Sequence, residues 1–216
     1  MLTLGPLNRA EAVRYLGDAK VEMNDEMAHL LDVCEEKILR TAQPRYLTKV
    51  IDLPCPELMQ GRDIRMHLKG CRQAALVCCT LGGGIDRLLR TAQVTDMSQA
   101  VVLDVLASVA VEQVGHQVDD ILAAKYPDQY FTFRFSPGYG DFPIQMQSFF
   151  LEQLNAPKRI GLTTNRQFLL TPTKSITAVA GMSDEPVSRR HRGCASCNLR
   201  SECEYRKVGK HCGDDV

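Results

Sequence analysis

The sequence predicts an α+β fold: a twisted mixed or antiparallel sheet with flanking helices, followed by a small cysteine-rich C-terminal segment. Helical and strand-like segments do not alternate regularly, which disfavours a doubly wound parallel sheet. No internal repeat is present. Four of the nine cysteines lie close together near the C-terminal end. The boundary between the two parts is expected near residues 184–188, which gives a body of 1–185 and a tail of 186–216.

The N-terminal part predicts two helices. Asn8 followed three residues later by Glu11 resembles a capping box that opens a short helix, which Gly17 ends. Apolar residues from Met27 to Ile38 recur at helical spacing, so the second helix buries one stripe, and Pro44 ends it.

The next segments predict two strands joined by a short helix. Tyr46 to Leu53 has the pattern of a strand, and Asp63 can cap a helix that runs through Leu68. Ala74 to Thr80 is a compact apolar run typical of a buried strand. Cys78 and Cys79 are adjacent within it and point to opposite faces, so we expect both to fill the core.

A glycine run, Gly82 to Gly84, separates this strand from the longest helical region. Its backbone could present N–H groups to a phosphate, but it lacks the flanking residues of a P-loop, which favours a turn that permits close packing. Helical periodicity runs from Ile85 to a break near Thr95 and resumes from Ser98 to about Lys125.

The remaining body is predicted to be strand-rich. Tyr130 to Phe135 alternates as a strand, and a loop follows, after which Asp141 can cap a helix that ends at Leu154. Three short strands are then expected, over Arg159 to Thr163, Gln167 to Leu170 and Lys174 to Ala180.

Composition excludes several classes of protein. The 216 residues are 44% apolar and 24% charged, as in an ordinary soluble domain, and unlike disordered or collagen-like chains. Twenty-six basic residues balance 26 acidic ones, which argues against a nucleic-acid or anionic-membrane footprint over the whole protein. Neither a signal peptide nor an unbroken apolar stretch of membrane-spanning length is present, so we expect a cytoplasmic protein without a membrane partner.

The loop after the aromatic strand carries the most informative chemistry. Arg134 offers a guanidinium fork that can bind a carboxylate, Gly138 allows a ligand close to the main chain, and Tyr139 offers a stacking face. This set suits a zwitterionic ligand. The alternative is a Pro-Gly turn with Arg134 in a surface salt bridge.

These residues, Arg134-Phe-Ser-Pro-Gly-Tyr139, resemble the Arg-x-x-x-Gly-Tyr signature of the S-adenosylmethionine-binding activation domain of cobalamin-dependent methionine synthase. Residues 160–164 and 170–177 are similar to that domain's second block, a Gly-hydrophobic-x-Thr strand leading to a Pro-x-x-Ser turn. The Thr80–Gly84 segment and the long helix bearing Glu112 fall where the family has a strand, a glycine turn and a helix with a glutamate. The similarity covers roughly residues 70–180.

The resemblance implies roles for individual residues. Arg134 would bind the carboxylate of S-adenosylmethionine, and Glu112 its ammonium group. Main chain around Ser136 to Gly138 would hold the adenosyl part, and Tyr139 would face cobalamin. No side chain is assigned a catalytic role, because the family's work is positioning.

The resemblance also implies an activity and a partner. The family reductively reactivates cobalamin and methylates it from S-adenosylmethionine. The cobalamin would be carried by a separate cobalamin-binding methionine synthase or corrinoid protein.

The tail predicts a metal site. Cys194, Cys197, Cys203 and Cys212 are separated by two, five and eight residues, and four thiolates suit either zinc or an iron–sulfur cluster. Free thiols or two disulfides are the alternative. Seven basic residues against four acidic ones from 189 onward could steer an acidic electron donor such as ferredoxin or flavodoxin to a cluster.

Two other functions stay open at this point. One is a non-catalytic adaptor whose basic cysteine knuckle binds a protein or nucleic-acid partner. The other is a sensor that binds S-adenosylmethionine without turning it over.

Overall fold

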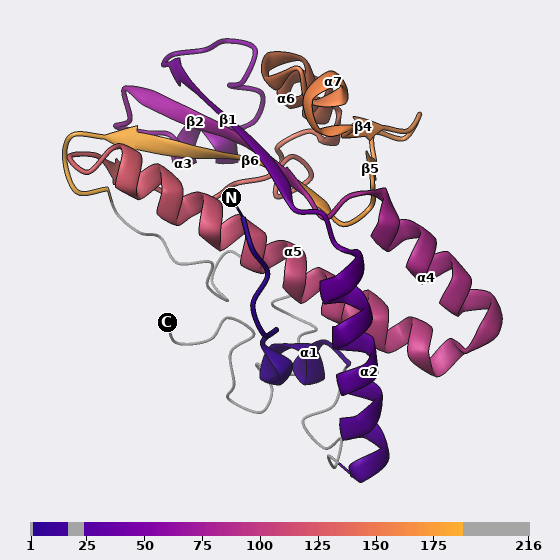
Figure 1. Ribbon diagram of the computed structural model, residues 1–216. Coiled ribbons are helices and arrows are strands. Elements are labelled where there is room, and N and C mark those ends of the chain that lie inside the picture. The colour runs from indigo at the N-terminus through magenta and orange to yellow at the C-terminus, as the bar shows by residue number, and fades with distance from the viewer. Residues whose placement is uncertain (1, 17–23, 188–216) are drawn as a thin grey trace, which may run out of the picture.

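A four-stranded antiparallel sheet organises the computed structural model, which describes residues 2–16 and 24–187 (Figure 1). Its strand order is β1-β2-β6-β3. The strands are β1 (Arg45–Asp52), β2 (Gln73–Thr80), β6 (Ser175–Ser183) and β3 (Tyr130–Phe131). All strand pairings in this sheet are antiparallel, which decides between the mixed and the antiparallel sheet that the sequence left open.

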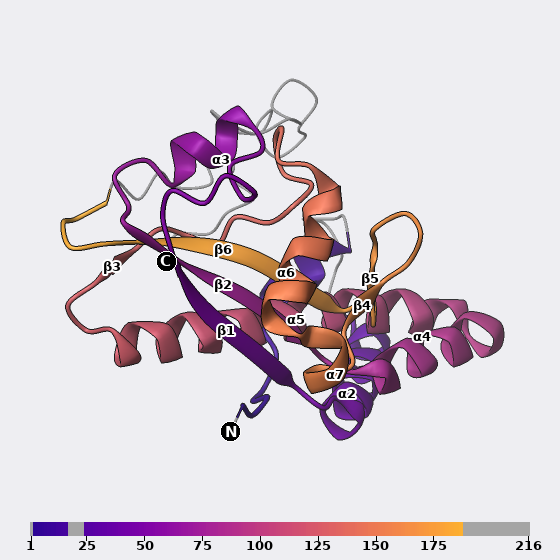
Figure 2. The ribbon, with the colours of Figure 1, turned by 90° about the horizontal axis from the view of Figure 1, so that it is seen from above.

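Helices cover both faces of the sheet, which gives three layers (Figures 1 and 2). One face packs against α1 (Arg9–Tyr15), α2 (Asp25–Thr41), α4 (Gly83–Thr95) and α5 (Met97–Lys125). The other packs against α3 (Arg62–His67), α6 (Gln147–Leu154) and α7 (Ala156–Ile160). A 3-10 turn, η1 (Ile144–Met146), precedes α6, and β4 (Thr163–Thr164) pairs with β5 (Leu170–Thr171) as a separate ribbon.

The central strand β2 divides the core into two clusters. Ala75, Val77 and Cys79 belong to the cluster under α5, whereas the alternate residues, including Cys78, belong to the cluster under α6. The predicted opposite orientation of the two cysteines is therefore confirmed. Burial raises the pKa of both thiols, that of Cys79 to about 12, so they remain protonated as apolar core groups.

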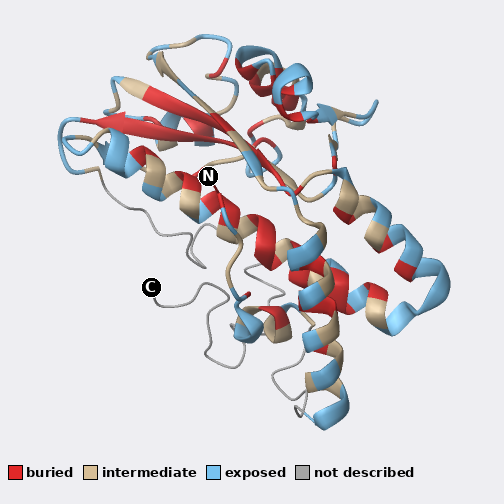
Figure 3. Ribbon diagram, in the orientation of Figure 1, coloured by how far each residue is buried: buried red, intermediate tan, exposed pale blue. Residues whose placement is uncertain are grey.

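Many residues of helix α5 are buried, and the helix packs against β2 and β6 of the sheet and against α1, α2 and α4 (Figure 3). Asp96 caps it by accepting a hydrogen bond from the Gln99 backbone N–H at 3.0 Å. By length and composition alone α5 could cross a membrane, but half of its apolar window is buried against the sheet and neighbouring helices, as in a core helix.

Three predicted elements are wrong or shorter than expected. The predicted strand over residues 159–163 is wrong except at Thr163, which begins β4, because α7 occupies Ala156–Ile160 between left-handed residues at Asn155 and Gly161. Residues 167–169 lie in the loop between β4 and β5, with Phe168 at a φ of 61°, and only Leu170 of the predicted strand is in β5. Regular strand β3 covers only two residues, and the chain then touches β6 through an isolated bridge between Phe135 and Val179.

Asp141 does not cap α6 as predicted. Its carboxylate instead accepts hydrogen bonds from the backbone N–H groups of Arg62 and Asp63, at 2.6 and 2.9 Å, at the start of α3. Asp63, the predicted cap of α3, accepts one from the Asp141 backbone N–H at 3.2 Å. This exchange ties the loop after Arg134 to α3.

Candidate functional site

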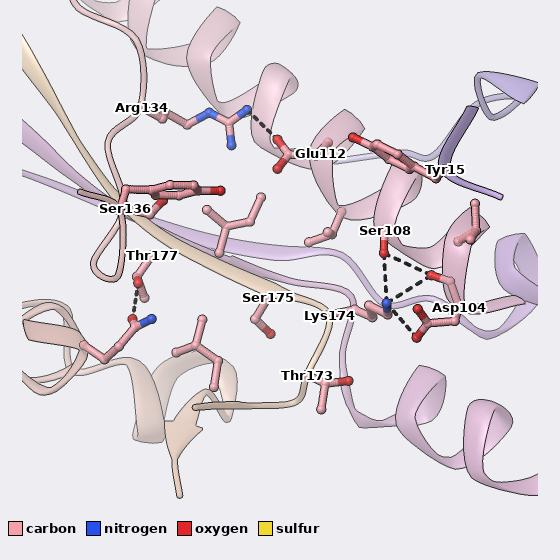
Figure 4. A pocket seen from close by; sticks show the side chains of 16 residues that line it. Tyr15, Asp104, Ser108, Glu112, Arg134, Ser136, Thr173, Lys174, Ser175 and Thr177 are labelled. Atoms are coloured by element: carbon pink, nitrogen blue, oxygen red, sulfur yellow. Dashed lines mark hydrogen bonds and ion pairs between the residues drawn. The ribbon is translucent and has the colours of Figure 1, made fainter. Parts of the chain in front are cut away.

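A cavity of about 600 Å³ lies between α5, the start of β6 and the segment that follows β3 (Figure 4). It contains four of the five binding residues that the sequence predicts: Glu112, Arg134, Ser136 and Tyr139. Gly138 is not part of its lining. Tyr15 of α1 also lines the cavity, although the sequence does not point to it.

Arg134 reaches from the loop to α5. The backbone of Phe135 exchanges hydrogen bonds of 2.9 Å with that of Val179, which anchors the segment beside β6. The Arg134 side chain is only 8% exposed, and its Nε donates to Asp119 Oδ2 at 2.9 Å while Nη2 donates to Glu112 Oε2 at 3.1 Å. It is therefore a buried member of a charge cluster, not a surface salt bridge.

The electrostatics of this cluster favour a permanently charged arginine. Burial opposes the charge of Arg134, but Asp119 and Glu112 outweigh it and raise the pKa of the guanidinium. Desolvation also raises the pKa of Asp119, in spite of the opposing positive charge. Two carboxylates face one guanidinium, so the cluster carries an excess negative charge.

The turn after Arg134 places Tyr139 at the rim. Gly138 adopts a φ of 93°, which favours glycine, and its N–H donates to the Phe142 carbonyl at 2.8 Å. Tyr139 is half exposed and lies 6.3 Å from Phe135 between ring centroids. An aromatic face is thus available at the opening of the cavity.

A second polar group, which no sequence motif predicts, lies at the other end of the cavity (Figure 4). Lys174 Nζ contacts Asp104 Oδ1 at 2.8 Å, and it donates to the Asp104 carbonyl at 3.0 Å and to Ser108 Oγ at 2.9 Å. Asp104 and Ser108 are one helical turn apart on α5. Their link to Lys174 depends on how β6 approaches α5, which no local pattern reveals.

Small hydroxyl side chains on β6 complete the floor. Ser175 Oγ is 2.7 Å from Thr80 Oγ1 and from the Pro172 carbonyl, and Thr177 hydrogen-bonds Gln147. Val105, Val111 and Ile176 add apolar surface. Two charged ends joined by an apolar and hydroxylated middle suit a ligand that combines a zwitterion with a larger, weakly polar group.

The predicted metal ligands Cys194, Cys197, Cys203 and Cys212 lie outside the described residues. Within residues 2–16 and 24–187, no group of three or more His, Cys, Asp or Glu side chains could hold a metal ion. The described cysteines are all free thiols: Cys34, Cys55, Cys71, Cys78 and Cys79.

Comparison with known proteins identifies a similar fold. No protein-family model matches the chain, and no curated protein matches it. Thirteen chains of solved structures do match. One is the crystal structure of the MetH reactivation domain bound to AdoHcy, with a TM-score of 0.62 and 15% sequence identity over 92% of this chain and 77% of that one. At this identity the likeness establishes the fold.

Proposed function

We propose that this protein binds S-adenosylmethionine and uses it as the methyl donor in the reductive reactivation of a cobalamin or corrinoid carried by a partner protein. The observation that carries the proposal is one cavity lined by Arg134 and Glu112, an opposite-charge pair, and by the half-exposed Tyr139. The fold of the MetH reactivation domain, solved with AdoHcy, supports the same ligand class.

The cavity residues match the groups of this ligand. The guanidinium fork of Arg134 binds the carboxylate, and Glu112 binds the ammonium group. The Ser136–Gly138 main chain, of which Ser136 lines the cavity, holds the adenosyl part. The excess negative charge of the Arg134 cluster complements the sulfonium, which gives the donor one net positive charge.

The opening of the cavity at Tyr139 suits the transfer of a methyl group to a partner protein. Cobalamin bound to a methionine synthase or corrinoid protein supplies the cobalt that accepts the methyl group. The chain's own part is to orient the donor, and the exposed Tyr139 ring provides an apolar surface against which a partner can exclude water.

Calorimetry with S-adenosylmethionine tests the binding. We expect the intact protein to bind, and Arg134→Lys to bind about 10- to 100-fold more weakly, because lysine keeps the charge but loses the planar fork. Arg40→Lys is the matched control, since Arg40 is an exposed helix residue paired with Glu36. Absence of binding, with and without a corrinoid partner, would contradict the proposal. Turnover with reduced corrinoid protein distinguishes a methyl donor site from a sensor.

We also propose that the four tail cysteines bind a metal centre, either zinc or an iron–sulfur cluster that relays electrons from ferredoxin or flavodoxin. Their number and spacing support this proposal. Anaerobic purification followed by metal analysis and visible absorbance tests it. Iron and visible absorbance would support the relay, a colourless zinc-loaded protein would exclude the relay, and metal-free thiols would contradict the metal site.

A further inference from the structure

The guanidinium of Arg134 lies against a glycine of α5. Glu112, Gly115 and Asp119 are three and four residues apart, which places them on one face of the helix. A Cβ atom at Gly115 would lie 2.6 Å from Arg134 Cζ and 2.8 Å from Nη2. Any side chain at residue 115 would therefore displace the guanidinium from its position between the two carboxylates.

The two carboxylates differ in their access to the cavity. Glu112 lines it and contacts Nη2, at the end of the Arg134 side chain (Figure 4). Asp119 contacts Nε, nearer the backbone, and is not among the lining residues. A ligand in the cavity thus reaches the Arg134–Glu112 pair, whereas the Asp119 contact lies behind it.

We infer that Gly115 and Asp119 are positioning residues that hold the Arg134 guanidinium in place, and that the zwitterionic end of the ligand binds by exchange into the Arg134–Glu112 ion pair. The ligand carboxylate replaces Glu112 on Nη2, and Glu112 accepts the ligand ammonium. This inference rests on the proposed function, because the zwitterion is the amino-acid end of S-adenosylmethionine.

Charge balance supports the exchange. One ion pair and one zwitterion become two ion pairs, so the exchange leaves neither Arg134 nor Glu112 without an opposite charge in a partly desolvated site. The Asp119 contact stays in place throughout, which keeps the guanidinium ordered and reduces the entropy lost on binding.

Gly115→Ala is the decisive variant. Alanine has a higher helix propensity than glycine, so α5 should remain folded. The alanine methyl group should nevertheless displace the Arg134 guanidinium. Binding is measured by NMR titration with two probes: S-adenosylhomocysteine, which has the amino-acid end, and 5′-methylthioadenosine, which lacks it. We expect about a 10- to 100-fold loss of affinity for the first and no change for the second.

Gly83→Ala is the matched control. Gly83 also lies in a helix near an arginine, but a Cβ there would be 4.0 Å from its nearest atom, Arg87 Nη1. Affinity for both probes should stay unchanged in this variant.

Asp119→Ala tests the second positioning residue, with the exposed neighbour Asp120→Ala as control. We expect a selective loss of S-adenosylhomocysteine affinity in the first variant only. The Nε–H resonance of Arg134 should be sharp in the ligand-free protein and persist when the ligand binds, whereas in Asp119→Ala and Gly115→Ala it should exchange rapidly with water.

The outcomes separate this inference from the proposed function. If the wild-type protein binds S-adenosylhomocysteine and Gly115→Ala binds it equally well, the inference is wrong and the proposed function stands. An equal loss for both probes would assign Gly115 a merely structural role and overturn the inference. A wild-type protein that binds neither probe contradicts both.

Discussion

At the scale of single residues, Asp141 shows how a side chain can act far from its place in the sequence. Its carboxylate accepts two hydrogen bonds from the first turn of α3, 78 and 79 residues away. These backbone hydrogen bonds favour the ionised form and lower the pKa of Asp141. The carboxylate also complements the positive end of the α3 dipole.

We therefore expect Asp141→Ala to lower the thermal midpoint by a few degrees at neutral pH. Because the folded-state pKa of Asp141 is depressed, its contribution is present above its ordinary pKa and is lost as the pH falls through the folded-state value. The difference between wild type and Asp141→Ala should accordingly shrink in acid, as measured by thermal unfolding across that pH range.

Asp128→Ala, at an exposed turn, serves as the control and should shift the midpoint little. A difference between wild type and Asp141→Ala that stays constant into acid would show that ionisation of Asp141 does not contribute to stability.

Among the binding residues, too, some could be predicted from neighbouring sequence and others depend on contacts between distant segments. The loop motif pointed to Arg134 and Tyr139, and the family resemblance added Ser136 and Glu112. The structure places all four around one cavity. Asp119 was missed, although its spacing from Glu112 on one helix face was a usable signal. The binding roles of these residues remain predictions that the experiments above test.

At the scale of elements, segments with strong local signals were predicted well. Asn8 caps α1 by accepting from the Glu11 N–H at 3.1 Å, and the structure begins β2 within a residue of the predicted start. The long helix and its break near Thr95 also match, since Asp96 ends α4 and caps α5. At the starts of α1 and α5 a capping side chain marks the helix, and in β2 a compact apolar run marks the buried strand.

Elements with weak local signals were predicted poorly. The segment 159–163 contains apolar residues at strand-like positions, yet all of it except Thr163 of β4 belongs to α7 and the turn that follows. Ala156 and Ile160 are buried in the cluster under α6, and that packing stabilises the short helix. For segments of five residues, tertiary contacts outweigh intrinsic preference.

At the scale of the whole molecule, the sheet separates two apolar clusters that belong to one fold. Ile85 of α4 lies in the cluster under α5, and Ile64 of α3 lies in the one under α6. Both side chains are fully buried. The β2–β6 backbone lies between the two clusters. A small cavity that a substitution creates in one cluster therefore does not directly contact the other cluster.

We expect Ile64→Val and Ile85→Val each to lower the free energy of unfolding by about 0.5–1.5 kcal/mol. The double variant should lose the sum within about 0.5 kcal/mol, because the two side chains belong to different core clusters. Urea unfolding of the wild type and the three variants measures this. A coupling energy well above that limit would show that the sheet transmits packing strain between its faces.

The sequence by itself determined the α+β class, the main helices, the buried strand β2 and four of the residues that line the cavity. Local periodicity and capping chemistry carry that information, because they depend on neighbours a few residues apart. Only the tertiary structure decided that Asp141 caps α3, that Lys174 joins Asp104, and that Gly115 leaves room for Arg134 between Glu112 and Asp119. Those pairings depend on how distant segments approach one another across the sheet, and the burial of many side chains together sets that approach.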